Sequence, residues 1–350
     1  MRKTRLIVQS KIPHNSQIIT GFLRLKEQGF PVEMEDCTTV KDMSMDGMPI
    51  ILANYAGEMI VYDLGDGYNA PDSMRPLLKK CQVYFKRSFS ARKNAELFPE
   101  LQHKMYPLGF NYHVTCKGNP INEPMWKHVM KLLVGRAPDR YFVPEVFEGK
   151  AERKTDGSVK ILFLARLWDD HEPGFSDSEN AERTYINNMR IEIIRALREK
   201  YGDSFIGGLN DNALSRAWAP DLIMPAKYTE RRNYLKLLHS SDICIGSMGL
   251  FESIGWKTGE YVAAAKAIVN EKMHFTVTGD FEEGKNYLSF RTSEECLKAV
   301  QTLVENPEKL YAMKLANEQY YHKYLRPDVL VKNTLDLVDR IQADVEKTEK

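Results

Sequence analysis

Residues 242–269 read DICIGSMGLFESIGWKTGEYVAAAKAIV, and this stretch decides the fold. The apolar run at 242–247 predicts a buried strand, and a glycine-containing loop follows it. Residues 257–270 then predict a helix that runs into the next strand. Strand, loop and helix in this order are the unit from which parallel sheets are built. Ligands of such sheets bind beyond the carboxyl ends of the strands.

The loop and the start of the helix have the properties of an anion site. Backbone N–H groups at a helix start can bind an anion, and the helix dipole favours negative charge there. Gly249 lies in the loop, and Gly255 lets a ligand approach the backbone closely. We therefore expect a diphosphate at this position. Glu252 and Glu260 lie on the same side of the segment, and their carboxylates are good acceptors for sugar hydroxyls.

This segment resembles the E-x7-E motif of group 1 glycosyltransferases with the GT-B fold, in the form E-x-x-G-x-x-x-x-E. Glu252, Gly255 and Glu260 occupy its three fixed positions. The resemblance implies that Glu252 lies by the donor sugar and that Glu260 binds the ribose of the nucleotide. It also implies the GT-B architecture, in which two Rossmann-like domains face each other across a crevice.

A second stretch, FLARLW at 163–168, resembles the strand of that family that ends in G-R-L. Arg166 matches the arginine that binds the donor diphosphate, whereas Ala165 replaces the glycine. The lysine that follows in the family is missing, because the chain continues as WDDH. Another basic group must then neutralise the phosphates. The candidates are Lys257, Lys227, Arg183 and Arg190.

The first half of the chain also alternates between strands and helices. Short apolar runs predict strands at 5–8, 49–55, 59–67 and 81–88, and helical spacing follows the first of them. This alternation predicts a parallel, doubly wound sheet and an α/β fold. A further helix is predicted at 125–135, and 220–225 is a strand candidate in the second half.

A polar, turn-rich stretch at 147–158 suggests a domain boundary. We expect an N-terminal Rossmann-like acceptor domain over 1–150, a C-terminal Rossmann-like donor domain over 158–330 and a final helix over 331–350.

In the first half, polar residues follow the predicted strands. His14 lies in the loop after the first strand, where a histidine can serve as a general base. The alternative is that His14 only caps the next helix. The strand-end residues Asp63, Asp66, Lys86 and Arg87 are candidates for contact with the acceptor.

Composition excludes several classes of protein. The 350 residues are 43% hydrophobic and 28% charged, which is typical of a globular enzyme and not of a disordered chain. The net charge of +1 gives no sign of a nucleic-acid partner. Five scattered cysteines indicate reduced thiols. No apolar run reaches the length of about 18 residues that a membrane span needs, so we expect a cytoplasmic protein, with peripheral membrane association left open.

Other motifs are absent from the sequence. It has no G-x-G-x-x-G fingerprint, no P-loop and no G-x-S-x-G elbow. The pair Asp169-Asp170 fits a surface turn, so no metal site is predicted. No cofactor is expected, since the nucleotide-diphosphate sugar is itself a substrate.

The resemblance implies a metal-independent, hexosyltransferase-type glycosyltransferase of polysaccharide biosynthesis. It would move a sugar from a nucleotide-diphosphate-sugar donor to a hydroxyl of a glycan or lipid-linked glycan, with retention. Two alternatives stay open. One is a sugar-nucleotide epimerase or phosphorylase on the same fold, and the other is a non-catalytic nucleotide-sugar binding protein.

Overall fold

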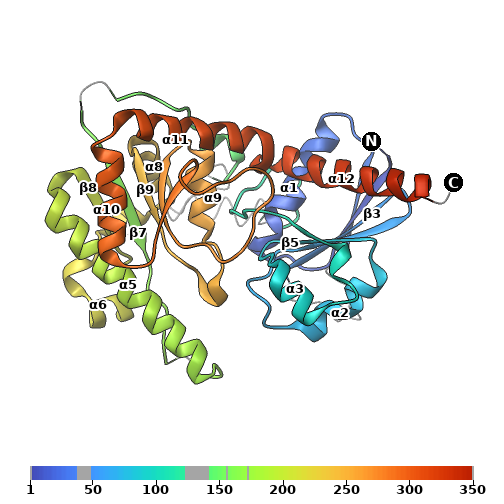
Figure 1. Ribbon diagram of the computed structural model, residues 1–350, viewed down its shortest axis with the longest axis horizontal. Helices are drawn as coiled ribbons and strands as arrows, with labels where there is room; N and C mark the ends of the chain where they lie inside the picture. The colour runs from blue at the N-terminus through green and yellow to red at the C-terminus, as the bar shows by residue number, and fades with distance from the viewer. Residues whose placement is uncertain (1, 38–48, 123–141, 155–156, 172, 349–350) are drawn as a thin grey trace. The chain divides into compact units, whose positions relative to one another are not determined.

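The computed structural model describes residues 2–37, 49–122, 142–154, 157–171 and 173–348. The helix predicted at 125–135 lies outside these residues. The chain is an α/β protein, as predicted, and it divides into two compact units with one sheet in each (Figure 1). Unit 1 comprises Met1–Pro144, Phe275–Gly279 and His322–Lys350, and unit 2 comprises Glu145–His274 and Asp280–Tyr321. These limits do not coincide with the boundaries predicted at 150 and 330.

The sheet of unit 1 has the strand order β2-β1-β3-β4-β5-β6 over the described residues. Its strands are β1 (Thr4–Val8), β2 (Val32–Asp36), β3 (Ile50–Tyr55), β4 (Glu58–Asp63), β5 (Val83–Lys86) and β6 (Met105–Pro107). Because β3 runs antiparallel to both β1 and β4, the prediction of a fully parallel sheet in this half is wrong. Ala56 and Gly57 join β3 to β4 and both have positive φ, which is the conformation of a two-residue type I′ hairpin turn.

Helices cover both faces of this sheet. They are α1 (Ser16–Glu27), α2 (Pro71–Lys80), α3 (Ala91–Leu97) and α12 (Pro327–Thr348). On one face α1 and α12 lie side by side (Figure 1), and a Cβ at Gly21 of α1 would lie only 2.2 Å from the Pro327 carbonyl oxygen. The Tyr62 hydroxyl of β4 bonds to Thr334 Oγ1 of α12 at 2.7 Å. The last helix of the chain therefore completes the core of the first unit.

The sheet of unit 2 has the strand order β11-β10-β9-β7-β8 over the described residues, and every pair is parallel. Its strands are β7 (Ile161–Ala165), β8 (Phe205–Leu209), β9 (Ile243–Gly246), β10 (Ala267–Glu271) and β11 (Tyr287–Phe290). The strand candidate at 220–225 is wrong, because the chain there forms the turn Pro220–Leu222 and a single bridge from Ile223 to Leu209.

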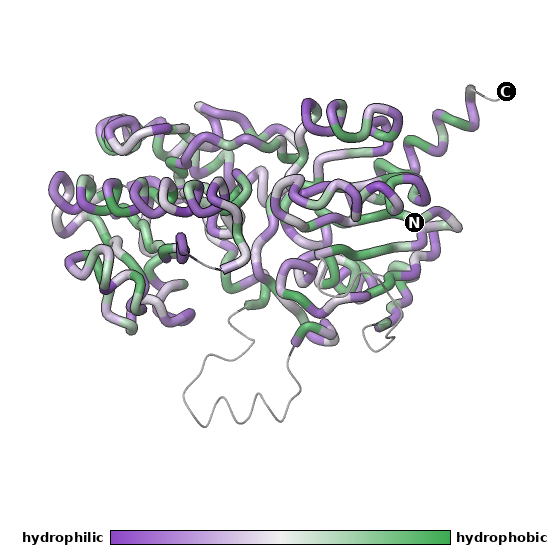
Figure 2. The backbone as a smooth tube through the Cα atoms, turned by 90° about the horizontal axis from the view of Figure 1, so that it is seen from below, coloured by the Kyte–Doolittle hydropathy of each residue, from purple (hydrophilic) through white to green (hydrophobic). Residues whose placement is uncertain are grey.

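The helices of unit 2 connect these strands. They are α5 (Asp177–Tyr201), α6 (Ala213–Trp218), α7 (Ala226–Thr229), α8 (Arg231–Ser240), α9 (Trp256–Ala263), α10 (Ser293–Val304) and α11 (Pro307–Tyr320). Figure 2 shows hydrophobic and hydrophilic residues alternating along the helices. In the described part of the chain, no helix combines the length and the apolar character that a membrane span requires.

Candidate functional site

The sheet of unit 2 has a topological switch point between β7 and β9. The chain leaves β7 through α5 towards β8 on one side, and it leaves β9 through α9 towards β10 on the other. Loops that diverge in this way leave room for a ligand beyond the carboxyl ends of the two strands. Arg166 follows β7 and residues 247–255 follow β9, so the structure brings both motifs of the sequence to this point.

Arg190 of α5 ties these two loops together. Its guanidinium donates to the Arg166 carbonyl at 2.5 Å, to Ser247 Oγ at 3.0 Å and to the Met248 carbonyl at 2.9 Å. Burial lowers the pKa of Arg190 to about 10. Arg190 was a candidate for phosphate binding, but its guanidinium is bonded to the protein itself, so it positions the loops.

Glu252 lies in an unusual segment of the loop. Phe251 and Glu252 both have left-handed backbone conformations, with φ of 57° and 58°, although neither is glycine. The Glu252 carboxylate is 3.8 Å from Nδ1 of His274, and both side chains are 43% exposed. A half-exposed carboxylate beside an imidazole can accept hydrogen bonds from a ligand and can take part in proton transfer.

Glu260 lies deeper than Glu252, as expected, and its side chain is almost fully buried. Its carboxylate accepts hydrogen bonds from Arg231 at 3.1 Å and from the Tyr234 hydroxyl. Burial, with Glu260 beside it, raises the pKa of Tyr234, so this hydroxyl stays a donor. Both carboxylate oxygens of Glu260 are thus engaged within unit 2, and its binding to a ribose stays a prediction.

The other basic candidates of unit 2 differ in exposure. The Lys257 side chain is half-buried, its ammonium donates to the Leu164 carbonyl, and burial lowers the pKa of Lys257 to about 8. Arg183 is buried, and its guanidinium lies over the Phe175 ring at 3.6 Å. Lys227 is exposed at the start of α7.

Arg166 is exposed, and its guanidinium lies over the Trp168 ring, 3.9 Å from the ring centre. Stacking on an indole orients a guanidinium while leaving its N–H groups at the edge, where they can meet a phosphate.

The glycines of the loop have packing roles. A Cβ at Gly255 would lie 3.2 Å from the Ser247 carbonyl oxygen, and a Cβ at Gly249 would lie 2.6 Å from Ser253 Oγ. Each glycine therefore lets two parts of the loop approach each other. Close approach of a ligand to Gly255 stays a prediction.

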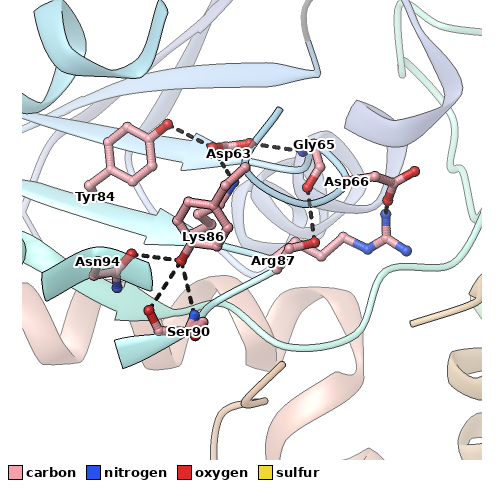
Figure 3. A network of polar contacts seen from close by, with 10 residues as sticks. Asp63, Gly65, Asp66, Tyr84, Lys86, Arg87, Ser90 and Asn94 are labelled. Atoms are coloured by element: carbon pink, nitrogen blue, oxygen red, sulfur yellow. Dashed lines mark hydrogen bonds and ion pairs between the residues drawn. The ribbon is translucent and has the colours of Figure 1, made fainter. Parts of the chain in front are cut away.

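In unit 1, the strand-end candidates form one polar network (Figure 3). The Asp63 carboxylate accepts from Lys86 Nζ at 2.9 Å, from the Tyr84 hydroxyl at 2.7 Å and from the Gly65 N–H at 2.8 Å. The side chains of Asp63 and Lys86 are only 6% and 2% exposed, and Arg87 bonds to Asp66. This network binds its charges internally, so Asp63 and Lys86 are not available to an acceptor.

His14 lies in the short turn Pro13–Asn15 before α1, and its carbonyl accepts from Asn111 Nδ2 at 2.9 Å. Burial, together with Arg87, lowers the pKa of His14, while Asp66 opposes the shift. The imidazole is therefore neutral near pH 7, which is the state that a general base requires.

Unit 1 also contains a cavity of about 650 Å³. Aromatic rings of Phe85, Tyr106 and Tyr324 line it together with residues of α12 such as Asn333 and Arg340. Its lining is thus mixed, with aromatic and aliphatic side chains beside about as many polar and charged ones.

Three residues with clear contacts were not predicted as site residues: His274, Glu182 and Glu271. His274 follows β10 at the carboxyl edge of the sheet, and this position was a signal available in the sequence. The buried Glu271 accepts from the Met248 N–H at 2.8 Å. Glu182 bonds to the loop from α5, and no local pattern could reveal a contact between residues 70 positions apart.

Among the described residues, no group of three or more His, Cys, Asp or Glu side chains could hold a metal ion.

No protein-family model and no curated protein matches this chain. Several solved structures are similar to it. The C-terminal domain of a group 1 family glycosyl transferase from Francisella tularensis is 11% identical over 51% of this chain and 96% of that one, with a TM-score of 0.33. HepE of Anabaena in complex with UDP is 10% identical over 97% and 100%, with a TM-score of 0.47.

A putative UDP-N-acetylglucosamine 2-epimerase from Listeria monocytogenes is 11% identical over 99% of this chain and 97% of that one, with a TM-score of 0.45.

Proposed function

We propose that this protein is a glycosyltransferase of GT-B type that takes its sugar from a nucleotide-diphosphate-sugar donor. One observation carries the proposal: the exposed Arg166 and the loop of Glu252 follow neighbouring strands at the switch point of the unit 2 sheet. A diphosphate requires a cation, and a sugar ring requires hydrogen-bond acceptors. Both are present at one edge of one sheet, where α/β proteins bind their ligands.

In the proposed reaction, the bond from the anomeric carbon of the sugar to the diphosphate breaks, and a bond to the acceptor oxygen forms. Arg166 stabilises the negative charge that develops on the leaving diphosphate. Glu252 accepts a hydrogen bond from a sugar hydroxyl and holds the ring in place. With retention of configuration, the leaving diphosphate accepts the proton of the acceptor hydroxyl, and no metal ion or protein base takes part. An inverting reaction would instead use a base such as His14.

The acceptor of this proposal is a hydroxyl group of a glycan or lipid-linked glycan that binds to unit 1. The cavity of about 650 Å³ supports such a site, because it combines aromatic rings with polar and charged side chains that can bind sugar hydroxyls. We also propose that the protein acts in the cytoplasm, where nucleotide sugars are made, and that it associates peripherally with a membrane when its acceptor is lipid-linked.

The test is a thermal-shift screen against UDP, GDP and ADP and their sugars, without added metal. We expect stabilisation by one nucleotide class, and we expect Arg166→Ala to lose it while Arg195→Ala keeps it. Arg195 is a suitable control, because it is an exposed arginine of unit 2 that pairs only with Asp221 among the contacts of the described residues.

In turnover assays Glu252→Ala should lower kcat, whereas Glu260→Gln should mainly raise the KM for the donor. Absence of a shift with every nucleotide would contradict a donor site.

A second candidate is a sugar-nucleotide epimerase, and the proximity of Glu252 to His274 favours it. An epimerase needs an acid and a base beside the donor sugar and needs no acceptor. A carboxylate 3.8 Å from an imidazole is one such pair. Incubation of the protein with its donor alone distinguishes the two functions, because only an epimerase would change the sugar without an acceptor. Binding without turnover under either condition would indicate a nucleotide-sugar binding protein.

A further inference from the structure

The loop that carries Glu252 has a backbone conformation that its own sequence does not favour. Phe251 and Glu252 are consecutive non-glycine residues in the left-handed region. Side chains disfavour this region because Cβ approaches the carbonyl oxygen. Such a conformation persists only where surrounding groups hold it, and such residues occur often at functional sites.

Glu182 of α5 is the group that holds it. The Phe251 N–H donates to Oε2 of Glu182 at 3.1 Å, and the Glu252 N–H donates to Oε1 at 2.9 Å. In an extended chain consecutive N–H groups point to opposite sides, so one carboxylate can accept both only where the chain is coiled. Coiled segments of this kind form concavities that bind anions. Both oxygens of one side chain thus bond to the two left-handed residues.

The length of α5 explains why Glu182 reaches the loop. With 25 residues the helix is about 37 Å long, whereas the five-residue strands of the sheet span about 17 Å. The first turns of α5 therefore extend past the carboxyl end of the sheet (Figure 1). Arg190, two turns further along the helix, bonds to Ser247 and Met248 at the start of the loop. One helix thus fixes the loop at its start and at its middle.

We infer that Glu182 is a positioning residue, which sets the direction of the Glu252 side chain towards the donor sugar. This inference rests on the proposed function, because it assigns a purpose to the geometry of Glu252. Without the Glu182 carboxylate, residues 251 and 252 relax to negative φ, and Glu252 turns away from its present position beside His274.

The test compares Glu182→Ala with the matched control Glu192→Ala. Glu192 is an exposed glutamate of the same helix, and its carboxylate accepts a hydrogen bond from Ser293 Oγ. We expect Glu182→Ala to lower kcat about 10- to 100-fold, the effect of a misplaced catalytic group. The affinity for the nucleotide diphosphate should stay unchanged, because Arg166 is not altered. Glu182→Gln keeps one carbonyl oxygen as an acceptor, so it should lose less activity than Glu182→Ala.

Three further measurements separate positioning from a general loss of structure. Glu182→Ala should add little to Glu252→Ala in the double variant, since both remove the same function. Adding Phe251→Gly to Glu182→Ala should restore part of kcat, because glycine adopts positive φ without strain. Amide hydrogen exchange should show lost protection of residues 251 and 252 in Glu182→Ala only.

A Glu182→Ala variant with the kcat of the wild type would overturn the inference, whether or not the two amides lose protection. A wild-type protein that neither binds nor turns over any nucleotide sugar would instead overturn the proposed function. Those two failures are distinct, because the first requires an active wild-type protein. Full additivity of Glu182→Ala and Glu252→Ala would also count against positioning.

Discussion

At the carboxyl edge of the unit 1 sheet, Asp63 and Lys86 are buried and bonded to each other, whereas Arg166 and Glu252 at the corresponding edge of unit 2 are exposed or half-exposed. The first edge uses its charges to hold the fold together. The second edge holds its loops with buried groups such as Arg190 and leaves other charges accessible to a ligand. A charged residue that follows a strand is therefore not by that fact in contact with a ligand. In unit 1 such residues stabilise the fold, and in unit 2 they are accessible to a ligand.

The largest effect should follow from removing one partner of the buried pair in unit 1. Asp63→Asn leaves the Lys86 ammonium buried without a counter-charge, and we expect a loss of about 3–5 kcal/mol in the free energy of unfolding. Urea denaturation measures this loss. The double variant Asp63→Asn with Lys86→Met should recover much of it, because no charge then remains buried. A loss below about 1 kcal/mol would show that water reaches this edge, and the contrast between the units would disappear.

The next largest effect concerns ligand affinity at the unit 2 edge. Arg166→Ala should weaken binding of the nucleotide diphosphate about 10- to 100-fold, since a hydrogen bond to a charged group contributes about 1.5–3 kcal/mol. Isothermal titration calorimetry measures the affinity, with Arg195→Ala as the control. Stability should change little, because the Arg166 side chain is exposed. Equal affinity of Arg166→Ala and the wild type would place the diphosphate elsewhere.

Several features of the fold were predictable from the sequence, and others had readable signals that the prediction missed. The strand at 242–247, the loop and the following helix were predicted correctly because apolar runs and glycines mark them locally. The strand β3 was predicted at 49–55, but its antiparallel direction was missed, although only Ala56 and Gly57 separate it from β4, which is a hairpin signal. Local sequence patterns therefore indicate well where strands and helices lie. They indicate less well whether a strand runs parallel or antiparallel to its neighbours.

The candidate site was less predictable, because its contacts join distant parts of the chain. The spacing of Glu252 and Glu260 gave their relative depth correctly, since Glu252 lies on the loop and Glu260 lies about one turn into the helix that follows. It could not reveal that Arg231 and Tyr234, on another helix, bond to Glu260. Likewise Arg190 was one of four candidates for phosphate binding, and only the tertiary structure shows it buried and bonded to two loops.

Lys257 offers a smaller test of the same comparison, since it is a half-buried cation that bonds to a carbonyl oxygen. Because burial holds its pKa at about 8 in the folded state, the protein should gain stability as pH rises from about 8 to 10.5, where only the unfolded chain still binds the proton. Lys257→Met should remove this gain and stabilise the protein by about 1 kcal/mol at pH 7.

Urea denaturation at pH 7, 8 and 9.5 measures both effects of Lys257→Met. Lys236→Met, at an exposed position of α8, makes the same chemical change and should have neither effect. A strong destabilisation by Lys257→Met would mean that its ammonium stabilises unit 2 as Lys86 stabilises unit 1.

The smallest effect concerns His14, at the edge of unit 1. Because burial and Arg87 lower its pKa in the folded state, the unfolded chain binds the proton first as pH falls below 6.5. The contribution of neutral His14 to the free energy of unfolding should therefore be fully present above pH 6.5. It should be lost as pH falls through the lower pKa that His14 has in the folded state. His14→Gln should flatten this part of the profile, whereas His103→Gln, at an exposed position, should not. If both variants gave the wild-type slope between pH 7.5 and 5.5, His14 would be hydrated and charged like a surface histidine, and its candidacy as a neutral base would fail.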